Sequence, residues 1–240
     1  MMTRSSLSHL ARRAVFAAAL LVASVGASQA SPARPVLIEL FTSEGCVSCP
    51  PADQLLGELA KQPGVLALAW HVGYLDGMGW KDKFSTRSAD ERQYDYSERL
   101  KLETMYTPQL VVDGSNETVG SDAGAVARLI HAAEQRLVEG PDLTVGHKDG
   151  LASVKVGAGS GSGAVWLVAY DKVQTSAVGR GQNAGRTLTE YQVVRKAVRL
   201  GLWHGKPLDL PLPQKAAEAE VVFVQPDAPG PMLATLAVDR

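Results

Sequence analysis

The sequence predicts an α/β fold over residues 31–141, with a mixed sheet flanked by helices, followed by a β-rich, sandwich-like domain over residues 142–240. Two observations predict it. Up to residue 141, short apolar runs alternate with segments whose apolar residues recur at helical spacing, as in folds built from strands and helices in alternation. After residue 142 only short β-type runs remain, which is typical of a small sandwich.

Two strands flanking a helix open the first domain. Residues 35–41 form a nearly continuous apolar run, as expected of a strand buried on both faces of a sheet. Residues 50–60 place their apolar side chains on one helical face. The breaker Pro63-Gly64 then precedes a second apolar run at residues 65–72. This order predicts a right-handed parallel crossover.

The remaining elements of the first domain complete the order β-α-β-α-β-β-α. Residues 86–102 are compatible with a helix. The strand at residues 109–112 turns at Asp113-Gly114, a dipeptide that favours a tight antiparallel hairpin. Residues 122–139 carry apolar residues at helical spacing and predict the last helix.

The second domain is predicted to consist of strands. We expect them at residues 151–156, 165–170, 191–198, 221–225 and 232–238. A glycine-serine stretch at residues 157–163 is closely flanked by two of these runs. We therefore interpret it as a flexible hairpin tip.

The N-terminus has the pattern of an export signal: a basic start ending at Arg12-Arg13, an apolar stretch, and small residues up to Ala30. The apolar stretch is shorter than the roughly 20 residues that span a bilayer. We therefore expect residues 1–30 to be a signal peptide and the mature chain to be periplasmic or secreted without a membrane span, an uncleaved anchor being the alternative. The net charge of −1 gives no indication of a nucleic-acid partner, and no pattern indicates an oligomeric state.

The chain has two cysteines, Cys46 and Cys49. Structural disulfides in an oxidising compartment usually close long loops, and this pair would close a very short one. The pair lies where a strand passes into a helix, and the helix dipole there favours a thiolate. These features predict a redox-active dithiol that needs no cofactor. Cys46, placed at the helix N-terminus, would attack a protein disulfide, and Cys49 would resolve the mixed disulfide.

Metal binding is the alternative from a different class. Copper(I) is satisfied by soft thiolates with one further donor. His71 ends the second strand on the same sheet edge, so it is the candidate third ligand beside Cys46 and Cys49. A structural or redox-tuning role for His71, and an interaction module with a vestigial dithiol, stay open as well.

Several polar residues surround the dithiol in the predicted fold. Trp80 lies in the loop after the second strand and either lines a substrate groove or is packed. Glu44 and Asp53 flank the dithiol and can accept protons during exchange. The simpler interpretation is that Glu44 is solvated and that Asp53 favours the first turn of the helix. The polar segment 180–186 of the second domain is expected to contact the first domain.

The element order with C-x-x-C and Thr107-Pro108 resembles the thioredoxin superfamily. The resemblance implies that Pro108 is cis, packs against the dithiol and shapes the substrate groove, and that Thr107 presents backbone groups to the substrate. His71 and Trp80 lie on the same edge and are expected in that groove. The Val-Ser spacer differs from the spacers of thioredoxins, glutaredoxins and the bacterial disulfide-forming oxidants.

A second set of sequence phrases covers nearly all of the mature chain: residues 39–46, 50–53, 71–72, 79–82, 106–109, 111–114 and 181–188. In these phrases the chain resembles, more closely, a bacterial family of exported thioredoxin-like proteins of unknown function. The resemblance implies a fold and a compartment but no established reaction.

Overall fold

The computed structural model describes residues 34–148 and 150–240 and contains two sheets and three α-helices. The first part holds β1 (Val36–Thr42), α1 (Pro50–Leu59), β2 (Val65–His71), the 3₁₀ turn η1 (Asp76–Met78), α2 (Arg87–Leu100), β3 (Gln109–Val112), β4 (Asn116–Val119) and α3 (Ala123–Glu134). The second part holds β5 (Leu143–Lys148), β6 (Leu151–Val156), β7 (Gly163–Ala177), β8 (Thr187–Trp203), β9 (Leu208–Pro211), β10 (Ala219–Pro226) and β11 (Ala234–Val238).

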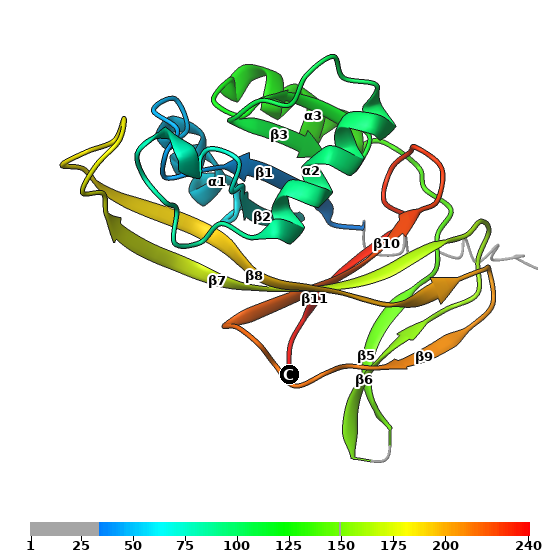
Figure 1. The fold of residues 1–240 in the computed structure, drawn as a ribbon. Helices are drawn as coiled ribbons and strands as arrows, with labels where there is room; N and C mark the ends of the chain where they lie inside the picture. Colours follow the sequence, from blue (N-terminus) through cyan, green and yellow to red (C-terminus); the bar gives the residue numbers. More distant parts are fainter. Residues whose placement is uncertain (1–33, 149) are drawn as a thin grey trace, which may run out of the picture. The chain divides into compact units, whose positions relative to one another are not determined.

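An eight-stranded mixed sheet runs through both parts of the chain, in the order β11-β10-β7-β8-β2-β1-β3-β4 (Figure 1). A separate antiparallel sheet has the order β5-β6-β9. The predicted α/β class, with a second β-rich layer, is confirmed.

Strand β1 is buried along its whole length because helices and strands cover both of its faces. It pairs in parallel with β2 and antiparallel with β3. Val36, Ile38 and Leu40 pack with α1 and α3. Leu37 and Phe41 point to the opposite face, toward α2 and the strands β7, β8 and β10. The alternation along a strand, with both faces covered, thus explains why the residues of β1 are nearly all apolar.

Strand β8 connects the second part of the chain to the first. It pairs in parallel with β2 through Ala69 and Val193 and forms a long antiparallel ribbon with β7. Tyr191 of β8 lies against α1 at Gly57, where an added Cβ would approach the tyrosine ring to 2.8 Å. The boundary expected at residue 141 therefore lies between two segments that contribute strands to one sheet.

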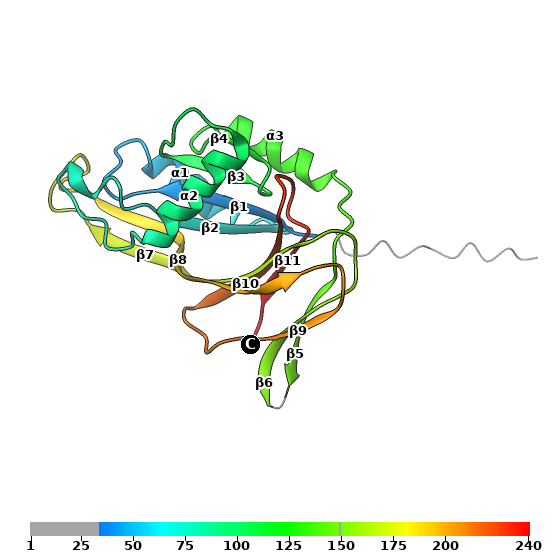
Figure 2. The ribbon, with the colours of Figure 1, turned by 45° about the vertical axis from the view of Figure 1, so that its right-hand side comes forward.

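The three-stranded sheet packs on the face of β7 and β10 that points away from α2, as Figure 2 shows. Val154 and Val156 of β6 share a buried core with Val165 and Leu167 of β7. Trp203 is fully buried in the same core and donates its indole N–H to the carbonyl of Gly157 at 3.0 Å. This layer is the sandwich-like arrangement that the β-rich sequence predicts.

A buried ion pair joins α2 to β1. Arg92 Nη2 donates to Glu39 Oε2 at 2.9 Å, and the Tyr96 hydroxyl donates to the same carboxylate. The guanidinium lies 5.0 Å from the Trp70 ring centroid and 5.1 Å from that of Phe223. The aromatic rings and the carboxylate together compensate for removing the charge from water.

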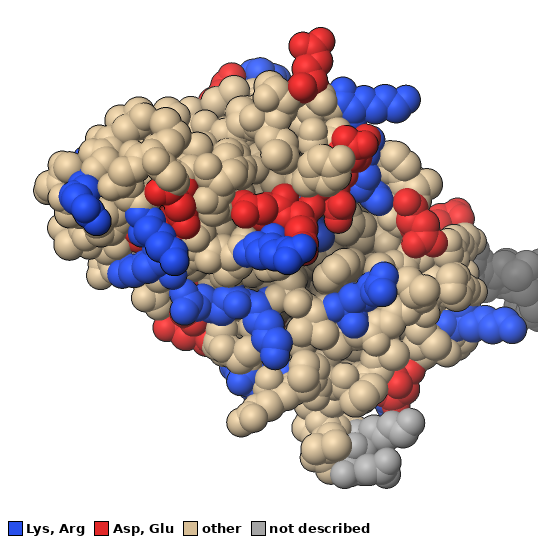
Figure 3. Space-filling model, in the orientation of Figure 1, with Lys and Arg blue, Asp and Glu red and all other residues tan. Residues whose placement is uncertain are grey.

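The outer face of α2 carries several carboxylates. Glu91, Asp95 and Glu98 line a cavity of about 450 Å³ beside the buried Arg92. Figure 3 shows acidic side chains gathered over this helix, with basic side chains next to them. The face shown therefore mixes both signs of charge.

Two sequence-based predictions of the fold were wrong. Residues 157–163 connect β6 to β7, which belong to different sheets, so they form a crossover and not a hairpin tip. Helix α3 ends at Glu134, five residues before the expected end. Strands β5 and β9 were not predicted, because they are short and their partly buried apolar residues alternate with polar residues, glycine or proline and form no continuous apolar run.

The predicted signal peptide, residues 1–30, lies outside the described residues. Within residues 34–148 and 150–240, no helix is long and apolar enough to cross a membrane.

Candidate functional site

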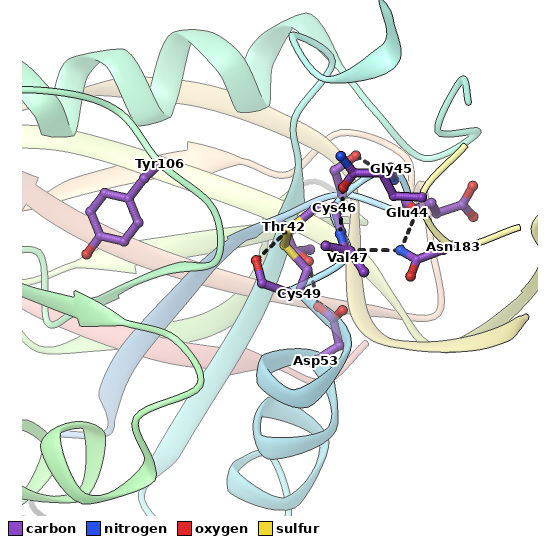
Figure 4. The surroundings of a disulfide bond; sticks show 12 residues. Thr42, Glu44, Gly45, Cys46, Val47, Cys49, Asp53, Tyr106 and Asn183 are labelled. Atoms are coloured by element: carbon purple, nitrogen blue, oxygen red, sulfur yellow. Dashed lines mark hydrogen bonds between the residues drawn. A yellow bond between two sulfur atoms is a disulfide. The ribbon is translucent and has the colours of Figure 1, made fainter. Parts of the chain in front are cut away.

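Cys46 and Cys49 form a disulfide bond in the turn between β1 and α1 (Figure 4). Cys46 is 6% exposed and Cys49 is completely buried, whereas Val47 and Ser48 between them are exposed. The Ser48 hydroxyl lies 3.4 Å from Cys46 Sγ. Cys46 is therefore the sulfur nearer to solvent.

The start of α1 differs in one respect from the expectation. Cys49, and not Cys46, occupies the N-cap position, and Cys46 lies in the preceding turn. Pro50 and Pro51 fix the start of the helix and have no backbone N–H to offer a thiolate. The electrostatic effect of α1 on the sulfurs thus comes from its dipole and not from the amides of these two residues.

The Thr107-Pro108 peptide bond is cis, as the resemblance implied. Pro108 is buried and Thr107 is partly exposed. A Cβ placed on Gly120 would meet the side chains of Ala52 and Pro108 at 3.2 and 3.3 Å. Pro108 therefore lies close to the first turn of α1, which begins at the dithiol.

Asn183, from the loop between β7 and β8, fixes the dithiol turn from the second part of the chain. Its side-chain amide donates to the carbonyls of Glu44 and Cys46, both at 2.9 Å, and its oxygen accepts from Arg186 at 2.7 Å. The adjacent Gln182 accepts a hydrogen bond from the amide of Val47 at 3.3 Å. The expected contact between segment 180–186 and the first part is confirmed.

Glu44 is buried, so the interpretation of it as a solvated residue was wrong. Its carboxylate accepts from the Trp80 indole N–H at 2.6 Å, and its amide donates to Asp82. Trp80 is partly exposed, and its ring lies 3.5 Å from the position of a Cβ on Gly179. The loop after β2 covers Glu44 in the folded chain, which the local sequence does not reveal.

His71 is fully buried and paired with a carboxylate that the sequence did not single out. Its Nδ1 lies 2.7 Å from Asp82 Oδ2. Burial opposes the charged imidazolium, but the hydrogen bond and charge of Asp82, with Glu190 and Asp53 nearby, outweigh it and raise the pKa of His71 to about 9. Burial alone would raise the pKa of Asp82, whereas His71 holds that pKa below its usual value.

Asp53 is also buried, and it has a role beyond a favourable position in the first helical turn. Its Oδ1 accepts from the Thr42 hydroxyl at 2.7 Å. Burial raises the pKa of Asp53 to about 6, although His71 and the hydrogen bond from Thr42 favour the charged form. Asp53 follows Cys49 by one helical turn, and Figure 4 shows it at the start of α1 beside that cysteine.

Glu190 of β8 is the site residue that sequence reasoning missed. It is 1% exposed, and its Oε2 lies 4.0 Å from His71 Nε2. Burial and the nearby Asp53 charge raise the pKa of Glu190 to about 8. One acidic residue in a polar, alternating strand gives no sequence signal; only the pairing of β8 with β2 brings it to His71.

A surface cavity of about 300 Å³ reaches the buried carboxyls from solvent. It lies between the first turn of α1 and the start of β8. Its lining consists of Pro50, Pro51, Asp53, Gln54, Arg186, Thr187, Leu188, Thr189 and Glu190.

The predicted groove and metal residues lie in different surroundings. Thr107 and Trp80 are partly exposed, whereas His71 is buried in the carboxylate cluster. Among the residues that the structure describes, no three His, Cys, Asp or Glu side chains are grouped so that they could hold a metal ion, so Cys46, Cys49 and His71 form no such group here.

A family model described as a protein of unknown function, DUF1223, matches residues 37–225. The chain belongs to the DUF1223 family. The match includes the dithiol turn, the cis-proline and Glu190, so every residue of the site described above lies within the family region of this DUF1223 protein.

Two solved structures are similar to this DUF1223 protein. A crystal structure of a protein from Agrobacterium tumefaciens has a TM-score of 0.72 and 27% identity, and the match covers 87% of this chain and 96% of that one. HBP35 of Porphyromonas gingivalis has a TM-score of 0.54 and 12% identity, with coverage of 87% and 76%, and shows similarity of fold alone. No curated protein matches the chain.

Proposed function

We propose that this protein is an exported, thioredoxin-like thiol-disulfide oxidoreductase that acts on protein thiols or disulfides through Cys46 and Cys49. The observation that carries the proposal is the Cys46–Cys49 disulfide at the start of α1, with cis-Pro108 near the same helical turn. A pair that closes so short a loop adds little stability compared with one that closes a long loop. Thiol-disulfide exchange therefore explains the presence of this pair better than stabilisation of the fold does.

We assign the roles of the two sulfurs from their difference in exposure, with Cys46 as the nucleophile. In the reduced protein, the Cys46 thiolate attacks a substrate disulfide, forms a Cys46–substrate disulfide and releases one substrate thiolate. The buried Cys49 then loses its proton and attacks Cys46 Sγ. This second step restores the Cys46–Cys49 bond and releases the other substrate thiolate. Two electrons pass from the dithiol to the substrate disulfide.

Asp53 is the group placed to accept the proton of Cys49. It lies one helical turn after that cysteine, and its carboxylate is held by Thr42. Its pKa of about 6 makes it mostly ionised at neutral pH but still a competent base. Cys49 is completely buried, so its proton passes to a protein group before it reaches bulk water.

The substrate would approach on the side of the exposed Val47-Ser48 backbone. In the proposed mechanism, Thr107 and Trp80, both partly exposed, line the substrate groove beside the dithiol. Pro108 shapes the same groove. The export pattern of residues 1–30 supports a periplasmic or secreted location, where disulfide exchange between proteins takes place.

Trapping of mixed disulfides tests the proposal. Cys49→Ser, expressed with its signal sequence, should accumulate mixed disulfides that are recovered after alkylation and identified by mass spectrometry. Cys46→Ser should accumulate far fewer, and Ser160→Ala, at an exposed serine between β6 and β7, should behave as wild type. The purified wild type should also equilibrate with glutathione. Absence of exchange with glutathione or a model disulfide over a wide range of potentials would contradict the proposal.

A further inference from the structure

Glu190 has an unusual environment for a buried carboxyl group. Its Oε2 and the facing Nε2 of His71 have no hydrogen-bond partner among the residues that the structure describes. Their separation of 4.0 Å is too long for a direct hydrogen bond. Leaving a buried polar atom without a partner is energetically unfavourable, so a purely structural glutamate is poorly explained at this position.

Glu190 also lies between the buried imidazole of His71 and the surface cavity. On its inner side lies the imidazole of His71, which is held by Asp82. On its outer side lies the 300 Å³ cavity between α1 and β8, which Asp53 lines as well. The two carboxyls therefore share one cavity, and Asp53 alone belongs to the helix that carries Cys49.

We infer that Glu190 is the proton-exchange group of the dithiol: it takes up, from Asp53, the proton that leaves Cys49 and releases it into the cavity between α1 and β8. The inference rests on the proposed function of Cys46 and Cys49. Glu190, from the second part of the chain, thus acts by way of Asp53 in the chemistry of the dithiol, which belongs to the first part.

The proton balance of the resolving step is complete without a further reactant. The S–H bond of Cys49 breaks as Asp53 accepts the proton, and the Cys49 thiolate forms the bond to Cys46 as the substrate thiolate leaves. Protonated Glu190 loses its proton to water in the cavity and then accepts the proton held by Asp53, which is ionised again. In the opposite direction the same groups return a proton to Cys49.

The charges around Glu190 fit this role. Asp53 of α1, Asp82 and Glu44 of two loops repel its charge, and His71 of β2 attracts it. Arg186 lies at the same cavity. Burial and these carboxylates raise the pKa of Glu190 to about 8, so that it can both bind and release a proton near neutral pH.

Carboxyl-carbon NMR of the wild-type protein tests the inference, and a variant serves only to assign the resonance. The Glu190 resonance, assigned by its loss in Glu190→Gln, is titrated in the oxidised protein and after reduction with a phosphine. We expect the titration midpoint to move by at least about half a pH unit between the two states, because reduction places ionisable sulfur beside the cluster. Equal midpoints would overturn the inference.

The rate of the resolving step is the second readout. A mixed disulfide is formed on Cys46, and closure by Cys49 is followed against pH. Glu190→Gln should slow closure about tenfold near neutral pH and change the shape of the profile. Glu190→Asp should restore part of the rate. Glu220→Gln, a buried glutamate paired with Arg240, is the matched control and should stay within about twofold of wild type.

The outcomes separate the two proposals. If wild type shows no exchange at any potential, the proposed function fails, and the NMR titration still reports whether Glu190 senses the dithiol. If exchange is normal in Glu190→Gln and its pH profile is unchanged, only the role of Glu190 is wrong.

Discussion

The side-chain amide of Asn183 donates a 2.9 Å hydrogen bond to the carbonyl of Cys46, across 137 positions of sequence. The same amide group donates to the carbonyl of Glu44. The turn that carries the dithiol is therefore held by a loop of the second part of the chain. The carbonyl of Cys46 also accepts a hydrogen bond from the amide of Cys49 within the turn, at 3.3 Å.

Asn183→Ala should destabilise the protein by about 1–3 kcal/mol, because it leaves two buried carbonyls without this donor. Unfolding in urea measures the loss. Gln182→Ala is the matched control, since Gln182 is exposed and its bond to Val47 is long, at 3.3 Å; it should cost less than about 0.5 kcal/mol. Equal effects of the two variants would contradict the clamping role of Asn183.

Gly57→Ala should destabilise the protein although alanine normally favours a helix. The new methyl group would lie 2.8 Å from the Tyr191 ring and push β8 away from α1. Overpacking of this kind costs roughly 1–3 kcal/mol.

The same substitution at Gly124 in α3 should instead stabilise the protein. The nearest atom to the new methyl group is the flexible end of Arg128, at 3.4 Å. We expect a gain of roughly 0.5–1 kcal/mol in thermal or urea unfolding. A stabilising Gly57→Ala would show that Tyr191 does not pack as described.

Replacing one partner of the buried pair of Arg92 and Glu39 should destabilise the protein more than replacing both partners. Arg92→Met leaves the Glu39 charge buried and should cost roughly 3–5 kcal/mol. The double variant Glu39→Leu with Arg92→Met removes both charges and should be clearly more stable than the single variant. Urea unfolding of the full double-mutant cycle measures the difference; additive losses would argue against the pair.

Stability should fall as the pH rises from mildly acidic to alkaline values. The pKa of Glu190 is raised from 4.5 to about 8 by folding, so the folded state binds more protons than the unfolded state between these values. Its contribution is therefore fully present below the lower value and lost as the pH rises through the upper one. His71, raised from 6.5 to about 9, acts in the same direction at higher pH. The pKa of Asp82 is lowered, so its contribution to stability is lost only as the pH falls.

Glu190→Gln should flatten this pH dependence. Between about pH 5 and pH 8, wild type should lose on the order of 1–3 kcal/mol more than the variant. Urea unfolding at a series of pH values checks it. Thr189→Ala, a neighbour in β8 that does not titrate, should keep the wild-type slope. An unchanged slope in Glu190→Gln would mean that Glu190 is ionised in the folded protein.

The sequence by itself determined the elements of the first part and the position of the dithiol. Apolar runs predicted β1 and β2, apolar residues at helical spacing predicted α1 and α3, and residues 86–102 were compatible with the helix α2. Asp113-Gly114 predicted the hairpin of β3 and β4. These signals depend on residues close together in the chain. The two cysteines at a strand-helix junction identified the site for the same reason.

Only the tertiary structure decided the environment of that site. Glu44 and Asp53 are buried because the loop containing Trp80 and the strand containing Glu190 cover them. Asn183 reaches the dithiol turn, and Glu190 reaches His71, through the pairing of β8 with β2. Burial and charge proximity depend on contacts between distant segments, and these set the protonation of the cluster behind the dithiol.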